Sequence, residues 1–246
     1  MPTTIIVPSK FPDIFEEYRR RADVFEPLTK KILVRDGHDI IDPSGWTTIQ
    51  AEGPFIYSRN VNLGINQTSG DVLLMNDDCC FTREGTVAAM EKILAAHSDI
   101  GILSPRIGGM VANATQSNVC RPVQYSTARL AFVCVLIRRA VLDKIGLLDE
   151  RFTGYGWDDD DFCRRAVDAG FRLACTADAY VMHGHGKRTW SSSFSRTGNS
   201  GHHTDNIKIY EQKWGTTHWG NASPVTNRAM VYTDSNKLVT DWWSRH

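Results

Sequence analysis

The sequence predicts an α/β protein in which helices flank a mixed, mostly parallel sheet. Short apolar segments alternate with segments of helical composition through the first half of the 246-residue chain. Such alternation is typical of parallel sheets with right-handed crossover connections. With 41% hydrophobic and 23% charged residues, the chain has the composition of one globular domain with a full core, or of one domain followed by a tail.

The first half of the chain has the clearest pattern of strands and helices. The predicted strands there are 3–8, 31–35, 71–75 and 100–104. Between them, residues 13–22 and 82–97 have helical composition, and Thr82 is the expected N-cap of the second helix. The apolar residues of that helix recur at helical spacing and predict a buried face. This face consists of Val87, Met90, Ile93 and Leu94.

The second half of the chain is less regular. Residues 107–128 mix Gly, Asn, Ser, Thr and Gln without clear periodicity, which indicates a long loop or hairpin over the functional site. Residues 131–137 predict a buried strand, 158–170 a helix, and 171–182 strands that return to the sheet. From Lys187 onward small polar residues predominate, as in a linker or a mobile lid.

These changes in composition predict one domain with an extension. The core is expected at 1–190, with halves at 1–105 and 106–190, followed by an extension at 191–246. The extension contains Trp219, Trp242 and Trp243. Exposed Trp side chains stack on sugars or bases, but a segment that folds back onto its own domain explains them as well.

The charge balance points to no particular class of partner. The 28 basic and 28 acidic residues give a formal net charge of zero, so the overall charge requires neither nucleic acid nor an acidic membrane surface. No stretch approaches the roughly 20 apolar residues of a membrane span. Residues 1–9 lack the basic start and apolar core of a secretory signal. We therefore expect a soluble cytoplasmic protein without membrane insertion, or one in the host cytoplasm if it is viral; its oligomeric state is left open.

The cysteines do not suggest a metal or disulfide framework. They lie at Cys79, Cys80, Cys120, Cys134, Cys163 and Cys175, without Cys-x-x-Cys spacing. In an intracellular protein such residues are expected to be reduced thiols that pack in the core.

Two acidic segments are the candidate sites. The apolar run 72–75 reads as a buried strand and ends at Asn76-Asp77-Asp78. In open α/β sheets, ligands bind outside the carboxyl ends of such strands. Mg²⁺ and Mn²⁺ prefer oxygen ligands and usually bind one or two carboxylates together with nucleotide phosphates. The alternative interpretation is a solvated turn.

The second acidic segment is the run of four aspartates from Asp158 to Asp161. Like charges this close raise some of the pKa values, and they attract a metal ion or the proton of a hydroxyl group. A general base requires such tuning. At the start of a helix the same residues also serve as an N-cap and as partners of the helix dipole, and the two roles are compatible.

Motifs in this order resemble the GT-A glycosyltransferases, in particular the inverting family 2 enzymes that use nucleotide-sugar donors. The resemblance covers residues 3–215, and it implies that 1–105 is a nucleotide-binding half and 106–190 an acceptor half of the core. It is carried by Thr4–Ser9, Ile32–Gly37, Ser58-Arg59-Asn60 with Gly64, Gly70–Asp78, Gly146–Phe152, Gly156–Ala166, Val181–Lys187 and the Lys-Trp-Gly segment Lys213–Gly215. Two positions depart from the family pattern, because Asn76 replaces the first acidic residue of the Asp-x-Asp motif and Asp158 replaces a Glu.

The resemblance implies a role for each matched residue of the donor site. Asp36 and Arg59 would hold the base, Asp77 the ribose and Asp78 the metal ion. Asn60 and Pro8 belong to the same nucleotide site. Asn76 would be a supporting residue.

For the metal ion, the resemblance implies His183 as a further ligand, with His185 in reserve. Lys187 would meet the diphosphate when the loop closes. By position, Asp159 is the candidate base that removes the acceptor proton, while Asp158 and Asp161 shape the acceptor site and the helix start.

The resemblance therefore implies a hexosyltransferase-like transferase with one in-line displacement, inversion, and a Mn²⁺ or Mg²⁺ cofactor. A UDP-sugar is the expected donor, because the family uses UDP most often, although thymine and guanine donors also occur. The acceptor is a glycan or small molecule, a protein, or a hydroxymethylated base in viral DNA. A basic groove for DNA would draw on Arg164, Arg165, Lys187, Arg188, Arg196 and Lys208.

Two other functions are open from the sequence. A catalytically inactive nucleotide-sugar-binding module is suggested by Asn76 and by the substitution at Asp158. Nucleotidyltransfer on a related fold is disfavoured, because Ser9–Pro12 is not the Gly-rich, basic loop that this class carries after its first strand.

Overall fold

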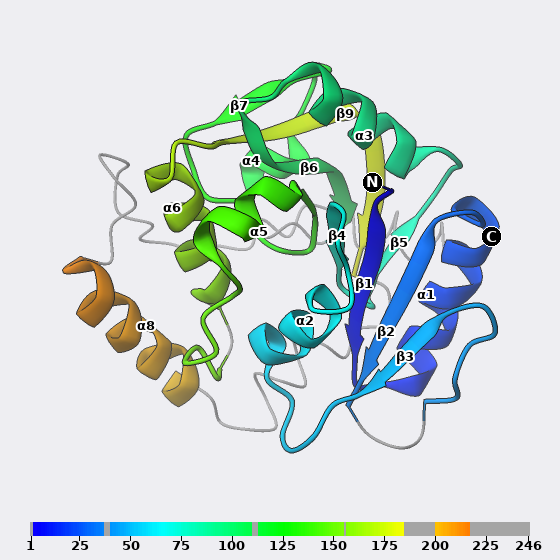
Figure 1. The fold of residues 1–246 in the computed structure, drawn as a ribbon, viewed down its shortest axis with the longest axis horizontal. Coiled ribbons are helices and arrows are strands. Elements are labelled where there is room, and N and C mark those ends of the chain that lie inside the picture. Colours follow the sequence, from blue (N-terminus) through cyan, green and yellow to red (C-terminus); the bar gives the residue numbers. More distant parts are fainter. Residues whose placement is uncertain (1, 37–39, 110–112, 155, 185–199, 217–246) are drawn as a thin grey trace.

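The computed structural model describes residues 2–36, 40–109, 113–154, 156–184 and 200–216. Within these ranges, helices cover both faces of one sheet (Figure 1). The strands are β1 (Thr4–Ser9), β2 (Lys30–Arg35), β3 (Thr47–Gln50), β4 (Val72–Met75), β5 (Cys79–Phe81), β6 (Ile100–Gly109), β7 (Gln124–Ser126), β8 (Cys134–Ile137) and β9 (Arg172–His183). The helices are α1 (Pro12–Phe25), α2 (Tyr57–Ile65), α3 (Thr86–Ala96), α4 (Ala114–Ser117), α5 (Arg139–Ile145), α6 (Asp158–Asp168) and α8 (Ser200–Trp214). The predicted α/β class with a mixed sheet is confirmed.

The sheet joins a parallel half to a mixed half. Its strand order is β3-β2-β1-β4-β8-β6-β9-β5, and β7 pairs with β9. β3, β2, β1 and β4 are parallel, so their carboxyl ends lie at one edge. β8 is antiparallel to both β4 and β6 and connects the two halves. The long strand β9 runs parallel to β6 and pairs at its carboxyl end with β5, which follows the acidic turn after β4.

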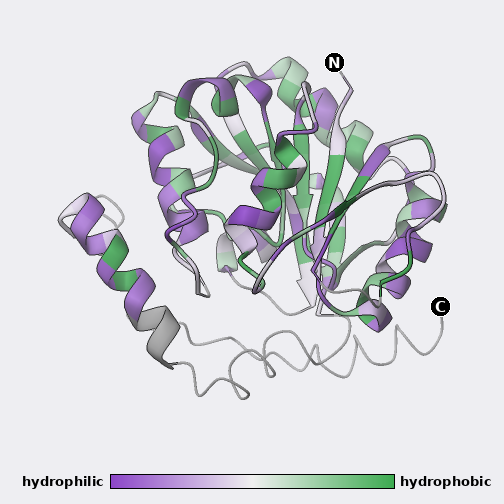
Figure 2. Cartoon of the chain, turned by 60° about the horizontal axis from the view of Figure 1, so that its bottom comes forward, coloured by the Kyte–Doolittle hydropathy of each residue, from purple (hydrophilic) through white to green (hydrophobic). Residues whose placement is uncertain are grey.

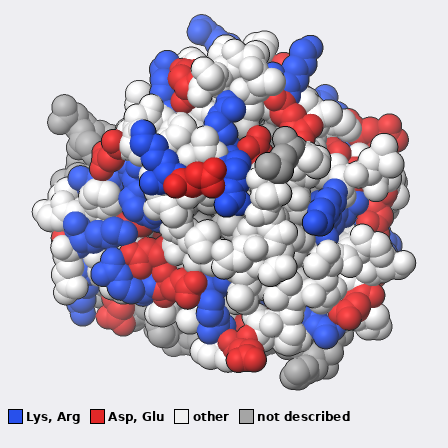
Figure 3. Space-filling model, viewed as in Figure 1, with Lys and Arg blue, Asp and Glu red and all other residues white. Residues whose placement is uncertain are grey.

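Burial follows the two faces of the strands. In Figure 2 the strands at the centre are mostly hydrophobic, whereas the helices alternate between hydrophobic and hydrophilic residues. On the surface, acidic and basic side chains are interspersed over the face seen in Figure 3. The alternation along the helices is expected when each helix buries an apolar stripe against the sheet and exposes its polar face to solvent.

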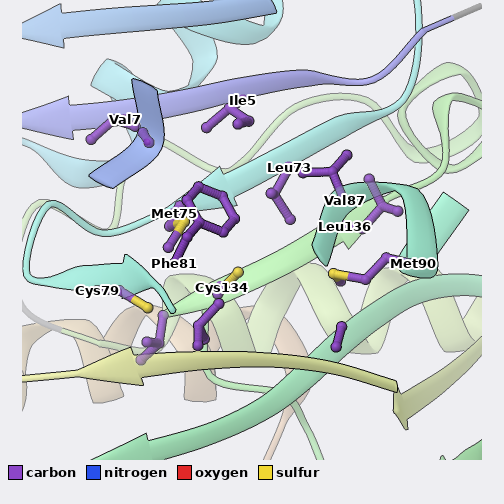
Figure 4. Close-up of a cluster of buried hydrophobic side chains, with 14 of the residues drawn as sticks. Ile5, Val7, Leu73, Met75, Cys79, Phe81, Val87, Met90, Cys134 and Leu136 are labelled. Atoms are coloured by element: carbon purple, nitrogen blue, oxygen red, sulfur yellow. The ribbon is translucent and has the colours of Figure 1, made fainter. Parts of the chain in front are cut away.

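The core consists of two clusters, one on each face of the sheet. Along β1, Ile5 and Val7 belong to the cluster under α1 and α3, whereas Ile6 belongs to the cluster under α2, α5 and α6. The first cluster surrounds Met75 at the end of β4 (Figure 4). Cys79 also packs there, so the acidic turn between these two residues is anchored by buried side chains at both of its ends.

Helix α2 packs close to the sheet because it carries a glycine at the contact. A Cβ on Gly64 would lie 2.5 Å from Ile6 Cγ2 and 3.3 Å from Val34 Cγ2. The predicted Ser58–Gly64 motif therefore lies on a helix, which the sequence analysis did not identify. Since α2 follows β3, its first turn lies at the edge where the parallel strands end.

Most predicted elements are present, and two details are corrected. Thr82 is not the cap of α3, because this helix begins at Thr86 and its N-cap is Gly85, which has a left-handed φ of 73°. The loop predicted at 107–128 contains the end of β6, helix α4 and strand β7. β6 extends as far as Gly109 because the longer β9 pairs with it from Ile100 to Gly109.

The described part of the predicted extension is helix α8, which packs beside α6 (Figure 1). The predicted boundary at residue 190 lies outside the described ranges. Among the helices of the described ranges, none is long and apolar enough to cross a membrane.

Candidate active site

The ends of β1, β2 and β4 bring three predicted donor residues to one edge. The backbone N–H of Asp36 donates to the carbonyl of Ser9 at 2.9 Å, and Ser9 Oγ donates to Asp77 Oδ2 at 2.6 Å. Asp77 and Asp78 are 7% and 4% exposed. Burial and the neighbouring Asp78 charge raise the pKa of Asp77 to about 7. These carboxylates are therefore not a solvated turn.

Asp78 is brought against His183 by strand pairing. β5 and β9 are antiparallel with Cys79 opposite His183, and the N–H of Gly184 donates to the carbonyl of Asp78 at 2.8 Å. His183 Nε2 lies 3.3 Å from Asp78 Oδ1. Within the described ranges, no group of three or more His, Cys, Asp and Glu side chains forms a metal cage. A carboxylate–imidazole pair nevertheless fits the open kind of site that Mn²⁺ or Mg²⁺ completes with phosphate oxygens and water.

Three predicted nucleotide residues carry buried polar atoms without a protein partner. They are Oδ2 of Asp36, Nε of Arg59, and both Oδ1 and Nδ2 of Asn60. Asn60 is fully buried on α2, and Arg59 uses Nη2 to donate to the carbonyl of Pro54 at 2.6 Å. An unpaired buried polar group costs about 1–3 kcal/mol. Several such groups at one edge of the sheet are characteristic of a site that a polar ligand satisfies.

Helix α6 begins in strained backbone. Gly156 and Trp157 are both left-handed, with φ of 81° and 76°, and Trp157 is the one non-glycine residue with positive φ within the described ranges. Such a conformation costs a non-glycine residue about 1–2 kcal/mol. Trp157 occupies the N-cap position, so none of the four aspartates caps the helix. They form its first turn, where the helix dipole favours negative charge.

Asp159 and Asp160 of α6 both contact one arginine, Arg129, which the sequence analysis missed. Arg129 Nη1 lies 3.3 Å from Asp159 Oδ2, and its Nε lies 2.6 Å from Asp160 Oδ1. Asp158 is 7% exposed, and its burial together with the Asp159 charge raises its pKa to about 8. The predicted rise in pKa caused by neighbouring like charges is thus present at Asp158. Arg129 lies far from these residues in sequence and has no motif of its own, so only the fold identifies it.

Tyr57 links the two acidic segments. Its hydroxyl donates to the carbonyl of Phe132 at 3.1 Å. Burial raises its pKa, and the charges of Asp158, Asp159 and Asp78 raise it further, so carboxylates of both segments act on one phenol. The sequence offered one indication of this residue, because Tyr57 directly precedes the Ser-Arg-Asn motif.

Asp161 faces away from this group. Its Oδ2 accepts from Arg165 Nε at 2.9 Å, and its Oδ1 accepts from Trp214 Nε1 at 2.9 Å and from Lys213 Nζ at 2.8 Å. These contacts tie α6 to α8. The predicted roles of Asp161, shaping the acceptor site and the helix start, stay predictions.

The remaining predicted residues are placed as follows. Pro8 is buried in β1 opposite Val34, next to Ser9. Asn76 closes the acidic turn through its backbone, because its carbonyl accepts from the N–H of Cys79 at 3.1 Å. His185 and Lys187 lie outside the described residues.

The predicted basic groove is only partly within the described ranges. Arg164 lies over the ring of Trp214 at 4.3 Å, and Arg165 donates to the carbonyls of Ile145 and Leu147. Lys208 lies 3.5 Å from Asp205. These three cations are thus engaged in contacts within the chain. Lys187, Arg188 and Arg196 lie outside the described residues.

Solved structures with a similar fold are glycosyltransferases of the GT-A type. TarS of S. aureus is similar with a TM-score of 0.60 at 15% identity over 79% of this chain and 38% of TarS. Its residues 1–349 in complex with UDP-GlcNAc give a TM-score of 0.56 at 15% identity, covering 77% of this chain and 61% of that one. GalNAc-T7 with UDP, GalNAc and Mn²⁺ gives 0.60 at 10% identity, covering 74% and 44%.

The chain therefore spans about two fifths of the length of TarS. The two proteins share a fold, but only 15% of the aligned residues are identical. No family model matches the sequence, and the comparison with curated proteins gives no match.

Proposed function

We propose that this chain is an inverting glycosyltransferase that moves a sugar from a nucleoside diphosphate sugar, most simply a UDP-sugar, to an acceptor hydroxyl. The observation that carries the proposal is the set of unpartnered buried polar atoms on Asp36, Arg59 and Asn60, together with the buried carboxylates of Asp77 and Asp78. A planar base, a ribose and a diphosphate offer the hydrogen-bonding groups that such a set requires. The GT-A fold supports this assignment, as do the nucleotides in the similar structures.

Donor binding is divided among the strand ends. Asp36 accepts from an N–H of the base, and Arg59 and Asn60 on α2 supply further polar contacts. Asp77, held by Ser9 Oγ, accepts from a ribose hydroxyl. Asp78 and His183 would hold Mn²⁺ or Mg²⁺, which supplies Lewis-acid stabilisation of the charge on the departing diphosphate.

The transfer step uses the first turn of α6. Asp159 takes the proton of the acceptor hydroxyl while its oxygen attacks the anomeric carbon. The bond from that carbon to the diphosphate oxygen breaks, and the diphosphate leaves with the electron pair. Arg129 fixes the orientation of the Asp159 carboxylate through the contact at 3.3 Å. Asp158, whose raised pKa of about 8 keeps it protonated at neutral pH, limits the negative charge beside the base.

The acceptor class that we propose is a glycan or a small hydroxylated molecule. Arg164 and Arg165 of the predicted basic groove are engaged by groups of the chain itself, which weakens the case for a DNA acceptor. The inactive-module alternative is weakened by the survival of carboxylates at the metal, ribose and base positions.

Calorimetry with UDP, dTDP and GDP, each with and without Mn²⁺, tests the donor site. We expect one nucleotide to bind in a Mn²⁺-dependent manner and Asp78→Ala to abolish that dependence. Glu84→Ala is the matched control, since Glu84 is an exposed carboxylate that lies outside the acidic turn, three residues after β5 ends at Phe81. Binding of none of the three, or binding indifferent to Mn²⁺ and to Asp78, would contradict the proposal.

A further inference from the structure

Helix α8 contacts the backbone that leads into the proposed base. Asn206 is 1% exposed, although it lies on the outermost helix of the described chain. Its Nδ2 donates to the carbonyl of Gly156 at 2.7 Å, and its Oδ1 accepts from the N–H of Gly154 at 3.4 Å. One side-chain amide thus holds both sides of the turn that ends at Trp157.

The contact continues along α8 toward its carboxyl end. The ring of Tyr210, which is 1% exposed, lies 5.0 Å from the ring of Trp157. Lys213 Nζ lies 2.8 Å from Asp149 Oδ2 and 2.8 Å from Asp161 Oδ1. α8 therefore holds the residues before the first turn of α6 as well as a carboxylate within that turn.

The turn that Asn206 holds is the strained one. Gly156 and Trp157 are consecutive left-handed residues, and a non-glycine residue keeps such a conformation only when its surroundings determine it. The next two residues are Asp158 and Asp159. A change in the φ and ψ angles of Trp157 would redirect both carboxylates, since no capping side chain fixes the helix start.

We propose that Asn206 is a positioning residue for catalysis, which acts by holding the backbone of Gly154 and Gly156 so that Asp158 and Asp159 face the acceptor. This inference rests on the proposed function for its catalytic consequence, but its structural part does not depend on any donor. Asn206 touches neither carboxylate. Its effect passes through the backbone of Gly156 and Trp157.

The test compares Asn206→Ala with Gln212→Ala, an exposed amide on the same helix. Hydrogen exchange measured by mass spectrometry reports the amides of 156–162 and, as an internal reference, those of 72–81. We expect Asn206→Ala to raise exchange at 156–162 alone and Gln212→Ala to change neither. Unchanged exchange at 156–162 in a folded Asn206→Ala protein overturns the inference.

The catalytic consequence is measured as hydrolysis of the UDP-sugar with Mn²⁺, in which water replaces the acceptor. A misplacement of about 1 Å costs about 100-fold in rate, so we expect kcat to fall about 10- to 100-fold in Asn206→Ala while the donor KM stays unchanged. Asn206→Asp, which keeps the size but places an acceptor against the Gly156 carbonyl, is expected to be equally deficient. An unchanged kcat with raised exchange overturns the positioning role. If the native chain hydrolyses no nucleotide sugar, the proposed function fails, whereas hydrogen exchange still decides whether Asn206 holds the turn.

Discussion

Asp158 and Asp159 are neighbours in the sequence, but their surroundings differ. Asp159 faces the guanidinium of Arg129, whereas Asp158 is buried without a described ion pair to a cation. Burial and the adjacent charge raise the pKa of Asp158 to about 8. Two carboxylates with unlike environments are a common basis for dividing roles within one active site. Each therefore has its own prediction.

Asp159→Asn is expected to reduce turnover of the donor by about 10²- to 10⁴-fold, because the variant cannot accept the proton of the acceptor hydroxyl. Nucleotide binding measured by calorimetry should be unchanged, since Asp159 lies in α6 and not at the strand ends. Asp168→Asn, at the exposed end of the same helix, is the control and should retain full activity. Full activity in Asp159→Asn would assign the base elsewhere.

The raised pKa of Asp158 predicts a pH-dependent stability. The folded state binds this proton more tightly than the unfolded state, whose Asp pKa is about 3.9. The contribution is fully present below about pH 4 and is lost as the pH rises toward the folded pKa of about 8. Asp158→Asn removes this titration, so its melting temperature relative to the native chain should increase from pH 5 to pH 8. A difference that stays constant over this range would show that Asp158 titrates normally.

At the scale of elements, the position of α2 decides whether the donor site exists. This helix carries Arg59 and Asn60, and its distance from β1 is set by Gly64. The motif that contains these residues was recognisable in the sequence. Its helical conformation and its distance from the sheet were not. Helical propensity depends on neighbours within one turn, whereas the close packing of α2 on the sheet depends on Ile6 in a distant strand.

Gly64→Ala is expected to destabilise the protein although it improves helix propensity. Alanine gains about 1 kcal/mol over glycine within a helix. Against this, the new methyl would lie 2.5 Å from Ile6 Cγ2, which is on a fully buried β-branched side chain, and overpacking of this kind costs about 1–3 kcal/mol. Urea unfolding should therefore show a net loss of stability, and nucleotide binding should weaken.

A double-mutant cycle provides the control for this prediction. Ile6→Ala removes the methyl group that the new side chain would meet, so the loss in the double variant should be smaller than the sum of the two single losses. Strict additivity would show that Gly64 is not limited by this contact.

At the scale of the whole molecule, the charges are balanced and mixed. The formal net charge is zero, and acidic and basic side chains are interspersed over the face in Figure 3. Proteins that bind nucleic acid through its phosphates instead gather their cations on one face. The face seen in Figure 3 does not gather cations in this way.

We therefore expect duplex DNA to bind more weakly than about 10⁻⁴ M at physiological salt, which is the weak end of non-specific binding. Fluorescence anisotropy with a labelled duplex, titrated at 50 mM and 200 mM salt, measures this affinity and its salt dependence. Tight binding that falls by about 10³-fold or more between these salt concentrations would reveal a basic surface and favour the DNA acceptor.

The sequence by itself determined the α/β class, most strands, and the two acidic segments, because these follow from local apolar periodicity and from motifs of adjacent residues. Tertiary structure alone decided which of these residues meet. The pairing of β5 with β9 brings His183 to Asp78, and the start of α6 brings Asp159 and Asp160 to Arg129. Local patterns carry no information about such contacts, since they depend on strand register and helix docking between distant segments.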